Sequence, residues 1–318
     1  MRLAIVMTSC AMPAMAQDFS LAQPIDCTLG ETCYIQNYVD TDPTEHAIDF
    51  QCGSLTYDTH KGTDFGLPSL AAMDAGVNVL VAADGVVRGT RNDMRDVIYS
   101  DQLATEINGR DCGNGVVIAH GGGWETQYCH LKEGSVVVRN GDAVTVGDTV
   151  GLVGLSGRTQ FPHLHISVRR DGQTIDPFDP AATGTCNTPP SETLWAEPIP
   201  TPQGGLLASG FSLGIPEYSS VKAGTAGHEQ LSANAPIVLW GFAYGTRPGD
   251  VVKISYSGPD GPLFETSDVL DRTQALTMRA GGLNPPHAGW ESGTYRGIIE
   301  HTRDDVVLGR QTSIAIVP

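Results

Sequence analysis

Two histidines separated by one residue stand in a segment rich in β-forming residues. His163 and His165 belong to the run 162–168, which its apolar and β-branched residues predict to be a strand. Residues i and i+2 of a strand point to the same face, so the two imidazoles converge. Converging imidazoles are typical of divalent metal sites, although a strand histidine on its own is more often a packing residue.

Two further motifs supply the groups that metal-assisted hydrolysis needs. His60 and Asp64 lie four residues apart, and Gly62 between them permits a tight bend. His130 lies in another β-type segment, where Cys129 faces the opposite side. Hydrolytic zinc sites combine three N or O ligands, an open position for water, and groups that transfer protons. The sequence contains side chains for each of these parts.

The motifs His-x-x-x-Asp, Tyr-x-His-Leu and Pro-His-Leu-His, in this order, resemble those of the lysostaphin-type zinc metallopeptidases, which are murein endopeptidases. The resemblance covers roughly residues 57–177. It implies an antiparallel duplicated hybrid motif fold for that part of the chain, and a zinc endopeptidase that hydrolyses peptide cross-links of peptidoglycan. The implied partners are the stem peptides of the cell wall.

The resemblance also implies a role for each site residue. His60, Asp64 and His165 would bind one Zn²⁺ ion. His130 and His163 would be the catalytic pair that orients the attacking water, moves its proton and stabilises the oxyanion, which suits a side chain that titrates near neutral pH.

The chain departs from the family pattern at three places. The segment 91–110 is longer than the usual connection, Cys129 replaces a small residue, and Gln160 and Phe161 precede Pro-His-Leu-His where small residues are common. We expect 91–110 to border the substrate groove and to tune access to it. His120 also matches a family position, and we interpret it as structural or as a partner of a site residue.

Two alternatives to this function remain open. One is a non-catalytic activator of other cell-wall hydrolases; such relatives typically lack ligands, and this chain lacks none. The other is a zinc endopeptidase that acts on Gly-rich proteins.

Composition sets the class of protein. The chain has 318 residues, about two domains' worth. With 36 acidic against 19 basic residues, its formal charge of −17 would repel a phosphate backbone, which disfavours nucleic acid as a partner. The 38 glycines and 20 prolines favour many turns and short strands, so we expect an all-β protein.

The N-terminus has the three-part layout of a secretory signal. Residues 1–16 comprise Met-Arg, an apolar stretch and a final Ala-Met-Ala, and we expect cleavage after Ala16. No later apolar run approaches the ~20 residues that span a bilayer, so we expect no membrane anchor after cleavage. The predicted location is periplasmic or secreted.

The cysteines indicate disulfides. Six remain after signal cleavage, an even number in an exported chain. A hairpin about Gly121, Gly122 and Gly123 would bring Cys112 opposite Cys129, and we predict that disulfide. Three pairings stay open for the others, which are Cys27, Cys33, Cys52 and Cys186.

A Pro-rich stretch at 187–205 predicts the domain boundary. Residues 17–186 would form the metallopeptidase domain, and 206–318 a small Ig-like β-sandwich whose partner the sequence does not indicate. The strands expected in the first domain are 77–82, 85–87, 116–119, 135–138, 150–153 and 163–168.

Three other groups of residues have plainer interpretations that we favour. Acidic residues that offer a calcium site are more simply turn caps: Asp40, Asp42 and Asp49. Aromatic residues that offer a glycan-stacking platform are more simply core: Trp195, Trp240, Trp290 and Tyr295. Histidines without partners at ligand spacing are surface or packing residues: His46, His228, His287 and His301.

Overall fold

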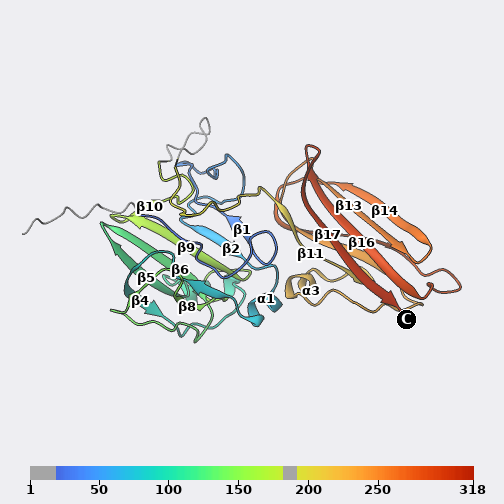
Figure 1. Ribbon diagram of the computed structural model, residues 1–318, viewed down its shortest axis with the longest axis horizontal. Coiled ribbons are helices and arrows are strands. Elements are labelled where there is room, and N and C mark those ends of the chain that lie inside the picture. Colours follow the sequence, from blue (N-terminus) through green and yellow to red (C-terminus); the bar gives the residue numbers. More distant parts are fainter. Residues whose placement is uncertain (1–18, 182–191) are drawn as a thin grey trace, which may run out of the picture.

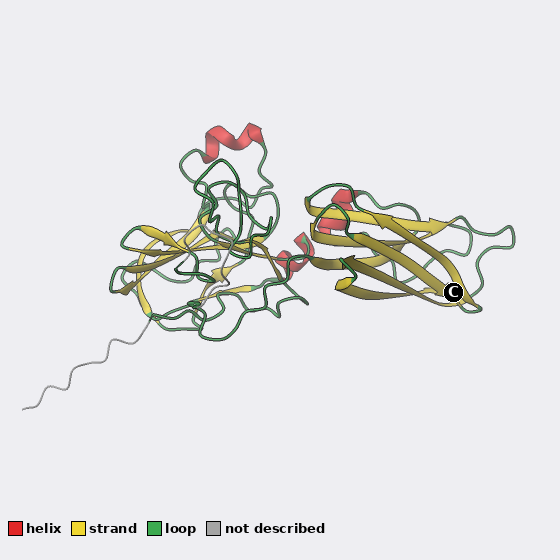
Figure 2. Cartoon of the chain, turned by 90° about the horizontal axis from the view of Figure 1, so that it is seen from above, coloured by secondary structure: helices red, strands yellow, loops and turns green. Residues whose placement is uncertain are grey.

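The computed structural model describes residues 19–181 and 192–318, which form two β-rich units (Figure 1). The predicted signal peptide and Cys186 lie outside the described residues. Antiparallel sheets dominate both units and the helices are short (Figure 2), so the expected all-β class is confirmed. In the described parts of the chain, no helix has the length and apolar character needed to cross a bilayer.

The N-terminal unit is built on one eight-stranded sheet in the order β1-β2-β9-β6-β5-β4-β7, with β10 paired to β9. A separate pair of strands, β3 and β8, completes the unit. The strands are β1 (Tyr34–Asn37), β2 (Thr63–Gly66), β3 (Asn78–Leu80), β4 (Gly85–Arg91), β5 (Asn114–Gly121), β6 (Trp124–Leu131), β7 (Ala143–Val144), β8 (Thr149–Leu152), β9 (His163–Arg170) and β10 (Gln173–Ile175).

The β5–β6 hairpin has the predicted turn and the predicted disulfide. Its three turn glycines, 121 to 123, all have positive φ, a conformation that other residues rarely adopt. Cys112 and Cys129 are bonded, with Cα atoms 4.8 Å apart. Cys27 pairs with Cys33, which settles part of the open pairing, and Cys52 is also disulfide-bonded.

The strand expected at 135–138 was wrong. Asn92 takes the place of a neighbouring strand there, since its side chain accepts from the Val136 N–H and donates to the Val136 carbonyl. Ser135 is likewise tied to the Lys132 carbonyl through its hydroxyl. Local side-chain bonds of this kind compete with a ladder, and periodicity alone does not reveal them.

The segment 91–110 continues from β4 into a short 3₁₀ turn (Asp101–Leu103) and α2 (Ala104–Ile107). The other helices are α1 (Leu70–Ala75) and α3 (Tyr218–Ala223). Ser69 caps α1 by accepting from the Ala72 N–H.

The C-terminal unit consists of two antiparallel sheets, β11-β12-β15 and β14-β13-β16-β17. Their shared core contains Leu239, Tyr256, Tyr295 and Ile299. The Ig-like topology stays a prediction. The strands are β11 (Gly205–Ser212), β12 (Ile237–Thr246), β13 (Val251–Gly258), β14 (Gly261–Val269), β15 (Gln274–Leu283), β16 (Gly293–Arg303) and β17 (Val306–Val317).

The four aromatic residues considered as a glycan platform are distributed over separate packed clusters. Trp195 is buried in the core of the N-terminal unit, and Trp240 and Tyr295 are buried in different clusters of the C-terminal unit. Trp290 packs against one of these clusters and donates its indole N–H to the Ala235 carbonyl. These residues therefore serve as core, as we favoured.

The two units are packed against each other. Tyr244 of β12 is 4% exposed and belongs to the core of the N-terminal unit, where its ring centroid lies 4.6 Å from that of Tyr34. Arg247 donates to the Gln203 side chain, and Gln51 to the Thr201 hydroxyl. The stretch before β11 is thus held at both ends, by these bonds and by buried Trp195.

Candidate metal centre

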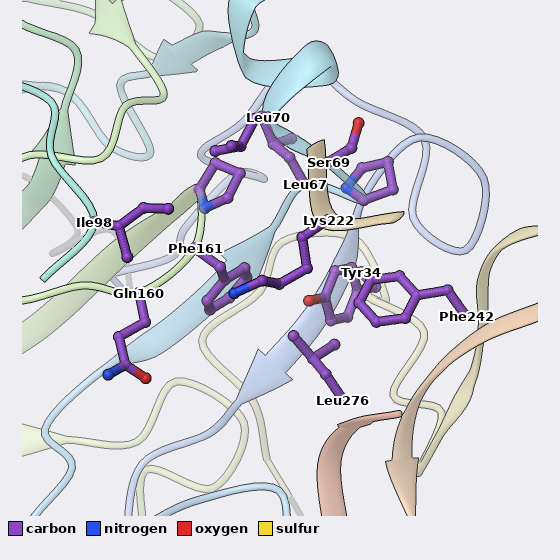
Figure 3. Close-up of a pocket in the computed structure, with 12 residues that line it drawn as sticks. Tyr34, Leu67, Ser69, Leu70, Ile98, Gln160, Phe161, Lys222, Phe242 and Leu276 are labelled. Atoms are coloured by element: carbon purple, nitrogen blue, oxygen red, sulfur yellow. The ribbon is translucent and has the colours of Figure 1, made fainter. Parts of the chain in front are cut away.

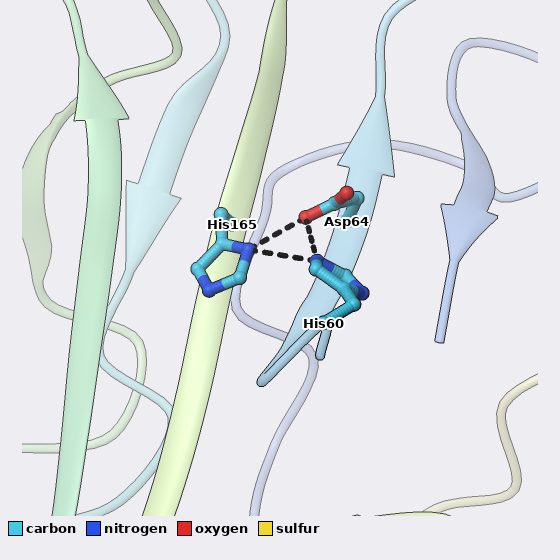
Figure 4. Close-up of side chains that lie close together, drawn as sticks. All are labelled: His60, Asp64 and His165. Carbon is cyan, nitrogen blue, oxygen red and sulfur yellow. Dashed lines mark hydrogen bonds and ion pairs between the residues drawn. The ribbon is translucent and has the colours of Figure 1, made fainter. Parts of the chain in front are cut away.

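Three ligand atoms from two distant parts of the chain meet at one point (Figure 4). His60 Nε2 lies 3.2 Å from His165 Nδ1 and 3.2 Å from Asp64 Oδ1. His165 Nδ1 lies 2.8 Å from the same Asp64 oxygen. Each residue offers one ligand atom, and the cluster supplies two nitrogens and one oxygen.

The sheet itself produces this meeting. β2 and β9 pair antiparallel with Asp64 directly opposite His165, so both side chains share one face. Gly62, just before β2, allows the chain to approach β9: a Cβ at this position would lie 2.6 Å from the His165 ring and 2.6 Å from the Ile166 carbonyl. The Gly62 position therefore excludes any side chain.

Hydrogen bonds outside the cluster orient the ligand atoms. His60 Nδ1 lies 2.6 Å from the Tyr38 carbonyl, which can only accept, so that nitrogen carries the proton and Nε2 is free for a metal. His165 Nε2 contacts the Ser167 hydroxyl at 2.9 Å, which turns Nδ1 toward the cluster. Asn37 donates to Asp64 Oδ2 at 2.9 Å and leaves Oδ1 to the cluster.

The histidines around Asp64 keep its carboxyl group ionised. Asp64 is buried. Burial alone would raise its pKa, but the charges of His60 and His163, with hydrogen bonds from His165 and His60, outweigh burial and hold that pKa well below its usual value. Asp64 is therefore a carboxylate that faces two imidazole nitrogens. This donor set fits a divalent cation, and three N/O ligands are the number found in catalytic zinc sites.

His130 and His163 lie beside the cluster, with ring centroids 4.6 Å apart. Their Nδ1 atoms contact backbone carbonyls, that of Ser156 at 2.8 Å and that of Phe161 at 3.0 Å respectively. Both Nε2 atoms are thereby free of the proton when the rings are neutral. Burial lowers the pKa of His163, and burial together with the neighbouring His163 lowers that of His130 well below its usual value.

His130 has a constrained backbone. Its φ of 62° lies in the left-handed region, which is uncommon for a residue with a side chain. The His130 N–H donates to the Cys112 carbonyl at 2.8 Å, and Cys112 is itself tied to Cys129 by the disulfide. Strained residues of this type concentrate at functional sites, where the surrounding structure maintains them.

A groove of about 1130 Å³ runs over these residues. Its lining includes Asp64, His130, His163 and His165, and most of the remainder is polar or aromatic. Tyr99 and Asp101 of the segment 91–110 also line it, so this segment borders the groove as expected. That it tunes access stays a proposal.

Phe161, one of the departures from the family pattern, lies against the candidate catalytic pair. Its ring is nearly parallel to that of His163, at 10° with a centroid distance of 4.9 Å. Thr159 adds a hydroxyl 3.1 Å from His163 Nδ1. The residues that replace the usual small ones therefore shape the groove wall next to His163.

The structure brings together all five predicted site residues and leaves the other candidates elsewhere. His120 contacts the Asp84 carbonyl and the Thr126 hydroxyl and does not line the groove. Asp40 and Asp49 accept from several backbone N–H groups, in agreement with turn caps. His301 is buried and contacts Asp250, whereas His46, His228 and His287 are exposed.

Sequence reasoning missed several groups that complete the site. Asn37 carries no motif, and its contact with Asp64 depends on the pairing of β1 with β2. The carbonyls of Tyr38 and Ser156 act through the backbone, so residue type gives no signal for them. Tyr57, which is 54% exposed and lies over the His60 ring, could have been noticed as an aromatic residue close to the first ligand.

Residues 58–177 match Peptidase family M23. The chain is 35% identical over 117 residues to the peptidoglycan DD-endopeptidase ShyA of Vibrio cholerae, an alignment that covers 37% of this chain and 22% of the relative. It is 32% identical over 128 residues to the DD-carboxypeptidase/endopeptidase Mpg of Neisseria meningitidis, which covers 40% of this chain and 24% of that protein. The chain thus spans about a quarter of the length of these relatives.

Solved structures also match part of this chain. A zinc-containing peptidase from Vibrio cholerae has 25% identity and a TM-score of 0.29, covering 46% of this chain and 39% of the other. The catalytic domain of lysostaphin from Staphylococcus simulans has 20% identity and a TM-score of 0.29, covering 44% of this chain and 85% of the other.

Proposed function

We propose that the protein is a zinc-dependent endopeptidase that hydrolyses peptide cross-links of peptidoglycan, since residues 58–177 match peptidase family M23. The observation that carries the proposal is the convergence of His60, Asp64 and His165 beneath a groove whose lining includes Asp64 and His165 together with His130 and His163. The relative named as a peptidoglycan DD-endopeptidase supports the substrate class.

The proposed ligands of one zinc ion are His60 Nε2, Asp64 Oδ1 and His165 Nδ1. A bound zinc ion supplies Lewis acidity, which polarises a carbonyl group and increases the acidity of a nearby water. The three residues leave room for water because each offers a single atom and all three approach from β2, β9 and the turn before β2. Asn37 keeps the second Asp64 oxygen occupied.

His130 and His163 are the proposed catalytic pair. Their Nδ1 protons are committed to backbone carbonyls, so each Nε2 can accept a proton from water or, once protonated, donate one to the reacting amide. Because burial lowers the pKa of both rings, they are neutral bases at neutral pH and return a proton readily. This matches the requirement of amide hydrolysis for a proton at the leaving nitrogen.

The proposed substrate is the stem peptide of peptidoglycan, and the proposed location is outside the cytoplasm, either periplasmic or secreted. The groove is large enough for an extended peptide, since pockets for small ligands range from ~300 to ~1000 Å³. A non-catalytic activator is not favoured, because every proposed ligand and both proposed catalytic histidines are present and assembled.

Digestion of purified cross-linked sacculi by the zinc-loaded protein tests this function. Mass spectrometry of the products should show dimeric muropeptides converted to monomers, with the glycan strands intact. A Gly-rich protein substrate, incubated in parallel, distinguishes an endopeptidase that acts on Gly-rich proteins from the proposed cell-wall endopeptidase. A protein that binds one equivalent of zinc yet leaves both substrates intact would contradict the proposal.

A further inference from the structure

The groove over the metal cluster is not lined by the N-terminal unit alone. Gly245 and residues 273–275 of the C-terminal unit also contribute to its lining. Gly245 lies near the end of β12, and residues 273–275 comprise the start of β15 and the residue before it. These two strands are paired, with Thr246 opposite Gln274. One edge of a C-terminal sheet therefore forms a wall of the groove.

This edge has a surface that is available to a substrate. Thr273 and Ala275 are exposed, and the Thr273 hydroxyl is both a donor and an acceptor. The next residue, Leu276, packs against the core of the N-terminal unit, and neighbouring residues of a strand point to opposite sides. Strand β15 thus packs Leu276 against the N-terminal unit and presents Ala275 to the groove.

Packed side chains hold the edge in position. Tyr34 and Phe161 of the N-terminal unit and Phe242 and Leu276 of the C-terminal unit line one apolar pocket between the units (Figure 3). Phe161 is also the residue whose ring lies on His163. Tyr34 in turn has ring contacts with Phe161, at a centroid distance of 6.4 Å, and with Tyr244 of the C-terminal unit, at 4.6 Å. Ring contacts therefore connect the C-terminal unit with the candidate catalytic pair.

A second contact lies at the helices. Gly224, at the end of α3, approaches Ser69 and Ala71 so closely that a Cβ there would lie 2.7 Å from the Ser69 hydroxyl oxygen. This contact and the burial of Tyr244 in the N-terminal core hold the C-terminal unit against the N-terminal unit at two further places. Domain interfaces that are extensive and apolar restrict relative motion, so the groove wall keeps its place.

We propose that residues 273–275 contact the substrate and set how far it extends on that side of the scissile bond. This inference rests on the proposed function. It defines the substrate as a peptide that continues beyond the scissile bond far enough to reach the C-terminal unit, as the second stem of a cross-link does. The C-terminal unit is then part of the substrate-binding surface.

The test is enlargement of the wall in the full-length zinc-loaded protein. Thr273→Trp and Ala275→Trp each place a bulky ring on the wall at an exposed position, where no packed contact is lost. Val306→Trp is the matched control, because Val306 is 61% exposed in the same unit and does not line the groove. Zinc content and melting temperature of each variant establish that the site and the fold are intact.

We expect kcat/KM for a purified cross-linked muropeptide dimer to fall about tenfold or more in the two wall variants, mainly through KM, and to be unchanged in the control. Equal kinetics in all three variants and the wild type would overturn the inference and leave the proposed function intact. Faster cleavage by the wall variants would also overturn it, because the wall would then be an obstruction. A wild-type protein that cleaves no cross-linked dimer would refute both.

Discussion

The Phe161 ring lies nearly parallel to the His163 imidazole, with centroids 4.9 Å apart. The backbone carbonyl of Phe161 contacts Nδ1 of the same imidazole at 3.0 Å. Phe161 therefore restrains both the plane and the tautomer of His163, the first through its side chain and the second through its backbone.

Phe161→Ala should lower kcat about tenfold, since the imidazole loses the ring that restrains its plane while the carbonyl contact remains. Zinc content should not change, because Phe161 contacts no proposed ligand. Phe161→Tyr keeps the stacked ring and should stay close to the wild type. Steady-state hydrolysis of a cross-linked muropeptide gives the measurement, and a wild-type kcat for Phe161→Ala would contradict the positioning role.

Loss of zinc and loss of catalysis should separate between the two groups of site residues. His60→Ala removes a proposed ligand and should abolish both zinc binding and activity. His130→Ala should retain about one equivalent of zinc and lose activity by about 10²–10⁴-fold, the usual contribution of a general acid or base. Elemental analysis after dialysis, with activity measured on the same samples, decides this. Zinc loss in His130→Ala would assign that residue to the metal.

The Cys112–Cys129 disulfide should support activity as well as stability. It closes a loop of 17 residues, for which chain entropy predicts a stabilisation of about 3 kcal/mol. The Cys112 carbonyl also accepts a hydrogen bond from the His130 N–H. The variant with Ser at both 112 and 129 should therefore lose activity as well as stability.

The matched control is the double Cys→Ser variant of Cys27 and Cys33. Their disulfide closes a loop of 6 residues, so its removal should lower the free energy of unfolding by about 2 kcal/mol. This pair contacts no site residue, so activity should persist at temperatures where the variant is folded. Urea unfolding and hydrolysis rates on both variants provide the comparison. Equal loss of activity in the two variants would show that only general stability is involved.

Asp176 should make stability fall as pH rises. Burial raises the pKa of Asp176 to about 7, and one of its oxygens is buried without a hydrogen-bond partner among residues 19–181 and 192–318. The folded protein keeps this proton up to about pH 7, whereas the unfolded chain loses it near pH 4, so unfolding releases a proton in between. Stability contributed by the protonated form is complete below pH 4 and is lost as pH approaches 7.

Asp176→Asn should remove this dependence, because an amide stays neutral and its oxygen can still accept from the Phe178 N–H. The free energy of unfolding of the variant, relative to the wild type, should increase by about 2 to 3 kcal/mol between pH 5 and pH 8. Urea unfolding at the two pH values measures it, and subtraction of the wild type cancels effects of the metal site. Parallel pH curves would contradict a raised pKa.

The local parts of the site could be predicted from the sequence, and the parts that depend on sheet order could not. The spacing of His163 and His165 predicts one shared face, and the hairpin register predicts the Cys112–Cys129 bond, because both depend on a few neighbouring residues. The ligand set as a whole came from the order of three motifs. Asn37 and residues 273–275 reach the site only through tertiary pairing, which leaves no trace in local pattern.

Tyr244 belongs to β12 of the C-terminal unit but is packed in the core of the N-terminal unit. A fragment that ends before β11 would leave Tyr34 without this neighbour and would expose an apolar face beside the groove. Such a fragment should therefore aggregate or melt at a lower temperature than the full chain. In calorimetry the intact protein should give one cooperative transition, because the interior of the N-terminal unit includes Tyr244 of the C-terminal unit.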